Sequence, residues 1–119
     1  MKQKPSMMPL VGLLFVFNIE NARNEEREEL IVSKNINVDA ELSELFDILL
    51  RPEFLSYPPS AQEKYIEIIS YYLKAGDTFD NLFEDMDTYF DQAIHDRRHF
   101  MEILLGCLGH YYSEGRFII

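Results

Sequence analysis

Acidic side chains that recur at helical spacing are the residues of this sequence with the clearest potential for chemistry. Asp77 is followed by Asp80, Glu84, Asp87 and Asp91 at steps of three or four residues. An α-helix would therefore place these carboxylates along one face, where they repel one another by about 0.2–0.5 kcal/mol per exposed pair. No Lys or Arg occurs between positions 77 and 92 to balance them. Such a row is typical either of a docking face for a positively charged partner or of a solvated helix face.

An aromatic side chain lies within the same stretch. Tyr89 falls outside the apolar stripe of the predicted helix, and tyrosine is a favoured anchor in protein interfaces, although burial between two helices would explain it equally well. The predicted partner-binding residues are Asp77, Asp80, Glu84, Asp85, Asp87, Tyr89 and Asp91. A second acidic group, at positions 20–29, includes two arginines and is typical of a solvated surface.

Histidines are weaker candidates. Asp91, His95 and His99 are four residues apart, so a continuous helix would align them as possible metal ligands. Arg97 and Arg98, between the two histidines, would oppose a bound cation. We therefore favour a structural role for the histidines at a helix junction.

Cys107 is the only cysteine, which excludes an internal disulfide and a thiolate zinc cluster. It falls on the apolar face of the last predicted helix and is expected to be a packing residue, although His110 is three residues away. No nucleophilic serine, Walker or glycine-rich phosphate motif occurs in the sequence. We expect no catalytic residues, no metal and no cofactor, and predict that the chain is not an enzyme.

The charge of the whole chain narrows the classes of partner. Its 119 residues include 11 Lys and Arg against 21 Asp and Glu, a net charge of −10. That charge repels a phosphate backbone and attracts basic proteins, so direct nucleic-acid binding is not expected.

An apolar run at positions 7–19 is shorter than the roughly 20 residues that span a bilayer, and no signal-peptide cleavage motif follows it. A cytoplasmic location without membrane attachment is expected.

The apolar spacing predicts an all-α fold, a compact bundle of about five helices in which residues 1–119 form a single domain. Residues 10–19 fit a helix slightly better than a buried strand. Asn37 and the capping box Ser60–Glu63 are predicted helix starts, and Gly76 is a predicted helix end. The predicted helices comprise residues 25–32, 38–51, 60–75, 77–93 and 96 onward.

The last predicted helix has the clearest amphipathic pattern. Gly106 and Gly109 interrupt it, and since glycine disfavours helix, we expect that another helix approaches closely there. The apolar stripe of this helix comprises Phe100, Ile103, Leu104, Cys107, Leu108 and Tyr111.

One stretch carries a resemblance to a known family. Residues 42–73, which include LFDILLRPEFL at 45–55 and PPSAQEK at 58–64, are similar to immunity proteins of bacterial contact-dependent growth inhibition systems, which are also small, acidic and helical. This resemblance implies that the chain binds and neutralises a cognate toxin domain, often a basic nuclease. Three alternatives remain: an inhibitor that mimics nucleic acid, a metal enzyme based on Asp91, His95 and His99, and a helical adaptor or regulatory subunit that docks through its last helix and residues 117–119.

Overall fold

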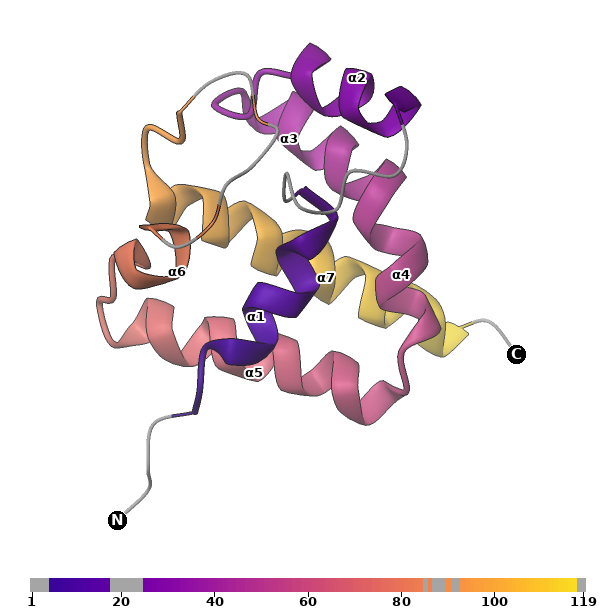
Figure 1. The fold of residues 1–119 in the computed structure, drawn as a ribbon. Helices are drawn as coiled ribbons and strands as arrows, with labels where there is room; N and C mark the ends of the chain where they lie inside the picture. The colour runs from indigo at the N-terminus through magenta and orange to yellow at the C-terminus, as the bar shows by residue number, and fades with distance from the viewer. Residues whose placement is uncertain (1–4, 18–24, 85, 87–89, 91–92, 118–119) are drawn as a thin grey trace.

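The computed structural model describes residues 5–17, 25–84, 86, 90 and 93–117 (Figure 1). All regular elements in these ranges are helical, which confirms the all-α prediction, and their buried side chains form one hydrophobic cluster. In chain order the elements are α1 (Met8–Leu13), the 3₁₀ helix η1 (Leu14–Phe17), α2 (Glu25–Ser33), α3 (Asp39–Leu45), the π-helical segment η2 (Phe46–Leu50), α4 (Arg51–Ser56), α5 (Pro59–Lys74), α6 (Asp80–Glu84) and α7 (Arg97–Phe117).

Helices α5 and α7 pack against each other in opposite directions (Figure 1). Arg98, near the start of α7, donates a hydrogen bond to the carbonyl of Leu73, near the end of α5. At the opposite end, the hydroxyl of Tyr112 donates to the carboxylate of Glu63. The continuous segment α3–η2–α4 also packs on α7. Helix α7 therefore contacts elements from both halves of the chain.

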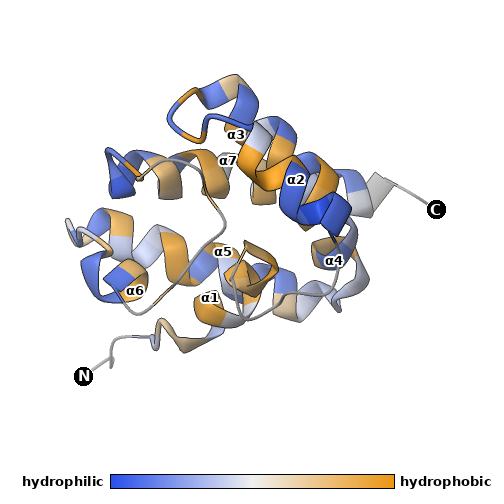
Figure 2. Cartoon of the chain, turned by 45° about the horizontal axis from the view of Figure 1, so that its top comes forward, coloured by the Kyte–Doolittle hydropathy of each residue, from blue (hydrophilic) through white to orange (hydrophobic). Residues whose placement is uncertain are grey.

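The ring of Phe100 connects these elements in the core. Phe100 is 2% exposed, and its ring centroid lies 5.5 Å from that of Phe46, 5.3 Å from Phe83 and 5.9 Å from Phe90. Phe17 of η1 in turn contacts Phe46 and Phe90. Apolar residues recur on α1, α3, α5 and α7, as the orange segments of Figure 2 show. A single side chain of α7 thus touches rings from η2, α6 and the segment that follows α6.

The first predicted segment is helical where it is described. Helix α1 continues directly into η1, and residues 18–19 lie outside the described ranges. The buried residues of this segment are Leu10, Leu13, Leu14, Val16 and Phe17. The preference for helix over strand is confirmed for residues 8–17.

The helix predicted for residues 77–93 is wrong. Helix α6 has only five residues, and the described residues beyond it are not helical. Phe79 has a φ of 62°, a left-handed conformation that keeps the helix from beginning at Asp77, and its side chain is fully buried. Phe90 is half-buried, and its ring packs on those of Phe17 and Phe100. Repulsion between neighbouring carboxylates further reduces the stability of a longer helix.

Two of the predicted helix starts differ from the structure. Helix α5 begins at Pro59 after Pro58, without a side-chain cap, so the predicted capping box at Ser60 is wrong. Proline at the first helical position fits because its missing N–H needs no partner there. Helix α3 follows Val38, whereas the Asn37 side chain binds the chain near His95 instead of capping the helix.

Gly76 ends α5 as predicted. It has a φ of 78°, its N–H donates to the carbonyl of Leu73, and the N–H of Asp77 donates to the carbonyl of Tyr72. This pair of bonds is a Schellman motif, in which glycine at the left-handed position satisfies the last carbonyls of the helix.

The apolar stripe predicted for α7 is confirmed, but the reason given for its glycines is wrong. A Cβ built at Gly106 or Gly109 meets no atom within 4 Å, so neither residue permits a close helix approach. Within the stripe, Ile103 and Cys107 are half-buried. The buried members are Phe100, Leu104, Leu108 and Tyr111.

Phe100→Ala should lower the free energy of unfolding by about 3–5 kcal/mol, because it removes a ring that contacts three others in the core. Urea denaturation followed by circular dichroism measures this loss. Ile48→Ala is the control, since Ile48 is 45% exposed and should lose much less. Equal losses in the two variants would contradict the central position of Phe100.

Candidate functional site

The structure describes three of the seven predicted partner-binding residues: Asp77, Asp80 and Glu84. The other four lie outside the described residues, and their assignment stays a prediction: Asp85, Asp87, Tyr89 and Asp91. Asp77 precedes the break at Phe79, and α6 begins at Asp80. The described carboxylates therefore do not occupy successive turns of one long helix, which corrects the geometry expected for this surface.

Asp77 has a structural role in the turn between α5 and α6. Its carboxylate accepts a hydrogen bond of 2.7 Å from the N–H of Phe79. Its backbone carbonyl accepts one of 2.6 Å from the Nη1 of Arg98. Asp77 is half-buried, and both of these contacts are with residues of the same chain.

Asp80 is already paired with a positive charge of the same chain. Its Oδ1 lies 2.8 Å from the Nη1 of Arg97, and hydrogen bonding to Arg97 lowers the pKa of the Asp80 carboxyl. The guanidinium of Arg97 also lies 5.9 Å from the ring centroid of Phe83. The expectation of an unbalanced acidic row is therefore wrong at Asp80. Glu84 is exposed, and no partner is assigned to it among the described residues.

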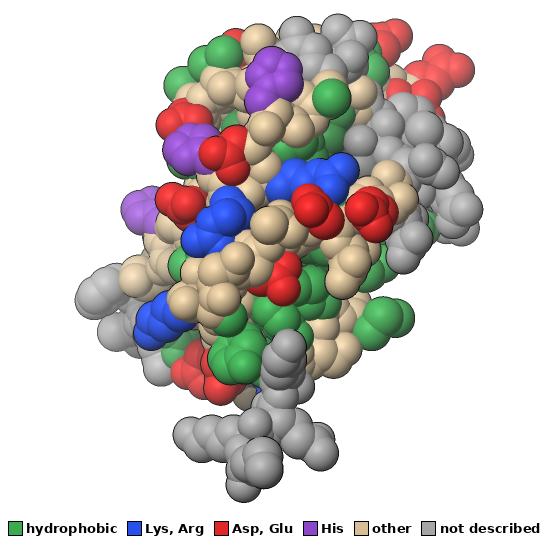
Figure 3. All heavy atoms as spheres, turned by 90° about the vertical axis from the view of Figure 1, so that its left-hand side faces the viewer, with side chains coloured by type: hydrophobic (Ala, Val, Ile, Leu, Met, Phe, Trp, Pro, Cys, Tyr) green, Lys and Arg blue, Asp and Glu red, His purple; other side chains and the backbone are tan. Residues whose placement is uncertain are grey.

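The face that carries α6 has mixed charge. Figure 3 shows red acidic side chains directly beside blue Lys and Arg side chains there. The positive charge that pairs with Asp80 is Arg97 of α7, which is outside the acidic stretch of sequence, so inspection of residues 77–92 alone could not find it. The sequence did contain one signal for this pairing: two adjacent arginines, at positions 97 and 98, follow a long interval without Lys or Arg.

Arg98 connects the start of α7 to the end of α5. Its Nη2 donates to the carbonyl of Leu73 at 3.1 Å, and its Nη1 donates to the carbonyl of Asp77. The last carbonyls of a helix carry partial negative charge, so a guanidinium there gains both hydrogen bonds and a favourable dipole interaction. Sequence analysis missed this role.

Arg98→Ala should destabilise the fold by about 1.5–3 kcal/mol, the range for hydrogen bonds to a charged group. Thermal and urea unfolding measure the loss. Arg97→Ala is the matched control, because its ion pair with Asp80 is exposed and exposed pairs contribute little. A larger loss for Arg97→Ala than for Arg98→Ala would contradict the role of Arg98.

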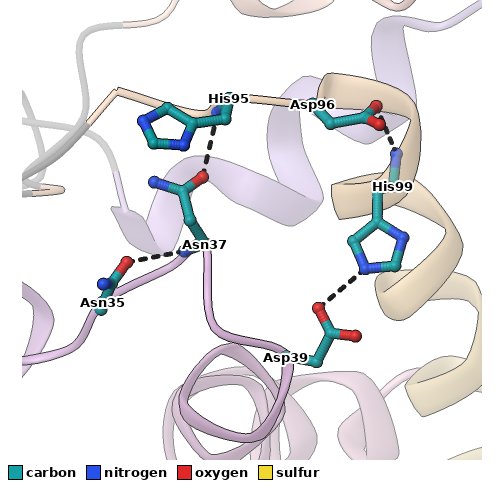
Figure 4. A network of polar contacts seen from close by, with 6 residues as sticks. All are labelled: Asn35, Asn37, Asp39, His95, Asp96 and His99. Atoms are coloured by element: carbon teal, nitrogen blue, oxygen red, sulfur yellow. Dashed lines mark hydrogen bonds and ion pairs between the residues drawn. The ribbon is translucent and has the colours of Figure 1, made fainter.

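The predicted histidine cluster forms a junction between the segment before α7 and the start of α3 (Figure 4). Asn37 accepts a hydrogen bond from the N–H of His95 at 2.9 Å and donates to the carbonyl of Ala93. The carboxylate of Asp96 accepts from the N–H of His99, which satisfies a donor at the beginning of α7. These contacts attach residues 93–96 to the loop before α3.

The two histidine rings do not converge on a common point. The Nε2 of His99 lies 2.7 Å from the Oδ1 of Asp39, whereas the His95 ring points away from His99 (Figure 4). Among the described residues, no group of three or more His, Cys, Asp or Glu side chains is placed to bind a metal ion. Asp91, the third residue of the predicted cluster, lies outside the described ranges.

The pairing with Asp39 raises the pKa of His99, chiefly through the hydrogen bond and then through charge attraction, with smaller contributions from Glu102 and Asp96. A raised pKa in the folded state means that the protonated pair stabilises the fold fully below the unfolded value of 6.5. This contribution disappears as the pH rises through the folded pKa.

The free energy of unfolding should therefore fall between pH about 6 and about 8.5 by less in His99→Gln than in the unmodified protein. Urea unfolding at the two pH values measures the difference, and NMR titration of the His99 ring in Asp39→Asn should show a lower pKa than in the unmodified protein. An unchanged ring pKa in Asp39→Asn would contradict the pairing.

A groove lies between the α3–η2 segment and α7, and we call it the α3–α7 groove. Its volume is about 360 Å³, and its lining residues are Ser43, Asp47, Glu102, Ile103, Gly106, Cys107, His110 and Tyr111. Asp47 and Glu102 are both exposed, and none of the described Lys and Arg residues lines the groove. Sequence analysis did not associate these two carboxylates, because they are far apart in the chain.

The polar groups of the α3–α7 groove do not form a nucleophilic centre. Burial raises the pKa of the Cys107 thiol, which opposes the thiolate form that nucleophilic catalysis requires. The Nε2 of His110 lies 3.3 Å from the Oε1 of Glu114, which also binds Arg51. The hydroxyl of Tyr111 donates to the carboxylate of Asp47, and burial and this contact raise the pKa of Tyr111. The arrangement favours binding of a positive group over acid–base chemistry.

A second hollow, the α1–α6 groove, has no charged side chain among its described lining residues. It has a volume of about 290 Å³ and is lined by Ser6, Met7, Met8, Val11, Asn81, Leu82 and Met86. Met8 is 72% exposed and Val11 is 36% exposed. Methionine side chains adapt readily to different apolar surfaces.

Comparison with known proteins found no match to this chain. No protein-family model matches the chain. No curated protein and no solved structure matches it significantly. None of the described helices is both long enough and apolar enough to cross a lipid bilayer.

Proposed function

We propose that this chain is an acidic helical binding protein that associates with a basic surface of another protein and blocks it by occupancy. The finer form of the proposal is an immunity protein or inhibitor of a toxin domain, as the resemblance of residues 42–73 implies, with a nuclease as the leading class of toxin. The observation that carries the proposal is the distribution of charge over the described surface.

Most described positive charges are engaged within the chain. Lys34 pairs with Glu44 at 3.1 Å and Arg51 pairs with Glu114 at 3.0 Å. The two arginines at the start of α7 bind Asp80 and backbone carbonyls, as described above. The negative excess of the chain is therefore directed outward, which favours encounter with basic proteins.

Several exposed carboxylates have no positive partner assigned among the described residues. These are distributed over α2, α4, α5, α6, η2 and α7 rather than along one helix. They comprise Glu25, Glu26, Glu29, Asp47, Glu53, Glu67, Glu84 and Glu102. This distribution supports attraction of a basic partner. Such a partner has two candidate docking places, the predicted acidic face at residues 77–91 and the α3–α7 groove.

A helical adaptor is the second candidate function. The exposed side chains of Met8 and Val11 beside the α1–α6 groove favour it, because an adaptor can recognise its partner through apolar contacts. This mode of binding would depend much less on salt than binding through carboxylates.

Binding kinetics separate the two candidates. We would immobilise the chain and measure association with a panel of basic nuclease domains from contact-dependent toxins, by biolayer interferometry. The proposal predicts that a cognate domain binds and that its association rate constant falls about tenfold or more as salt rises from about 50 to about 300 mM.

An acidic domain of similar size is the matched control and should not bind. Binding whose association rate is independent of salt would favour the adaptor. Absence of binding across a panel that contains the toxin domain encoded beside this chain would contradict the immunity assignment.

A further inference from the structure

The α3–α7 groove combines an apolar interior with negative charge at its rim. Ile103 and Cys107 are half-buried within it, whereas Asp47 and Glu102 are exposed and come from opposite walls, η2 and α7. A lysine or arginine side chain has the complementary structure, an apolar stem that ends in a charged group. A carboxylate that meets an arginine can also form a two-bond pair.

Gly106 forms part of the wall of this groove. It is exposed, lines the groove and lies in the interior of a helix of 21 residues. Glycine is among the least favourable residues at such a position. A Cβ at Gly106 meets no atom within 4 Å in the described part of the chain, so no contact seen there requires glycine at this position. An added side chain would project into open space where a partner could otherwise approach the backbone.

We propose that the α3–α7 groove receives a lysine or arginine side chain of a basic protein partner, with the stem against Ile103 and Gly106 and the charged group at Asp47 and Glu102. This assignment rests on the proposed function, that the chain binds basic proteins, and specifies the place and the chemistry of the contact. No described Lys or Arg side chain lines the groove. The Asp47 carboxylate accepts a hydrogen bond from the neutral Tyr111 hydroxyl, which leaves its negative charge in place, so both carboxylates present negative charge to the incoming cation.

Cys107 supplies a reporter for occupancy, because it is the only thiol of the chain and lines the groove. The probe is an octa-arginine peptide, with an octa-glutamine peptide as the uncharged control. Binding is measured by isothermal titration calorimetry at about 20 mM salt, and alkylation of Cys107 by neutral N-ethylmaleimide is followed by mass spectrometry. Each variant is compared with itself in the absence of peptide.

Two matched pairs of variants test the contact. Glu102→Gln removes a rim charge, and Glu67→Gln removes an exposed charge of α5 that is distant in sequence and does not line the groove. Gly106→Ala adds a methyl group to the wall of the groove, and Gly109→Ala adds one in the same helix at a residue that does not line it. Both alanine variants should unfold at higher urea concentration than the unmodified protein, which verifies that they are folded.

The expected result is that octa-arginine slows alkylation of Cys107 at least about fivefold, whereas octa-glutamine does not. Affinity for octa-arginine should fall about tenfold in Glu102→Gln, and it should fall in Gly106→Ala, with little change in the two control variants. If octa-arginine binds but Cys107 stays equally reactive, or if each pair of variants behaves alike, the groove assignment is wrong and a different acidic surface binds the peptide. If octa-arginine does not bind at all, both the groove assignment and the attraction of basic partners on which it rests are wrong.

Discussion

The start of α7 is the part of the molecule on which the remaining structure depends. Within four residues it supplies Arg97 to α6, Arg98 to the end of α5, and Phe100 to the aromatic cluster of the core. His99, on the opposite side, pairs with Asp39 at the start of α3. One helical turn therefore fixes three other helices, and the four contacts differ in physical type: an ion pair, bonds to helix carbonyls, ring packing and a pH-dependent pair.

This arrangement also explains the charge of the surface. Arg98 binds the carbonyls of Leu73 and Asp77, where it holds the start of α7 to the end of α5, and Arg97 pairs with the exposed Asp80. The protein has a net charge of −10, and many of the carboxylates that its own arginines do not bind are exposed. The proposed attraction of a basic partner follows from that division of roles, and the α3–α7 groove provides a shape as well as a charge for the contact.

Apolar periodicity predicted the elements that carry a strong local signal. The inner face of α7 and the end of α5 at Gly76 agree with the structure, because they depend on spacing and on a glycine conformation within one segment. The segment after Gly76 has helical spacing as well, but Phe79 adopts a left-handed conformation and Phe90 packs into the core. Those outcomes depend on contacts with residues distant in sequence. The groove carboxylates Asp47 and Glu102 were missed for the same reason, since only tertiary packing brings η2 beside α7.

Native-state hydrogen exchange followed by NMR is the most direct measurement of whether the start of α7 holds the other helices. The amides of residues 100–108 in α7 should exchange only through global unfolding and be the slowest of the chain, together with those of α5 that pack against them. The short helix α6 and the peripheral helix α2 should exchange faster, through local opening. Exchange in α7 that is as fast as exchange in α2 would contradict the central role of α7.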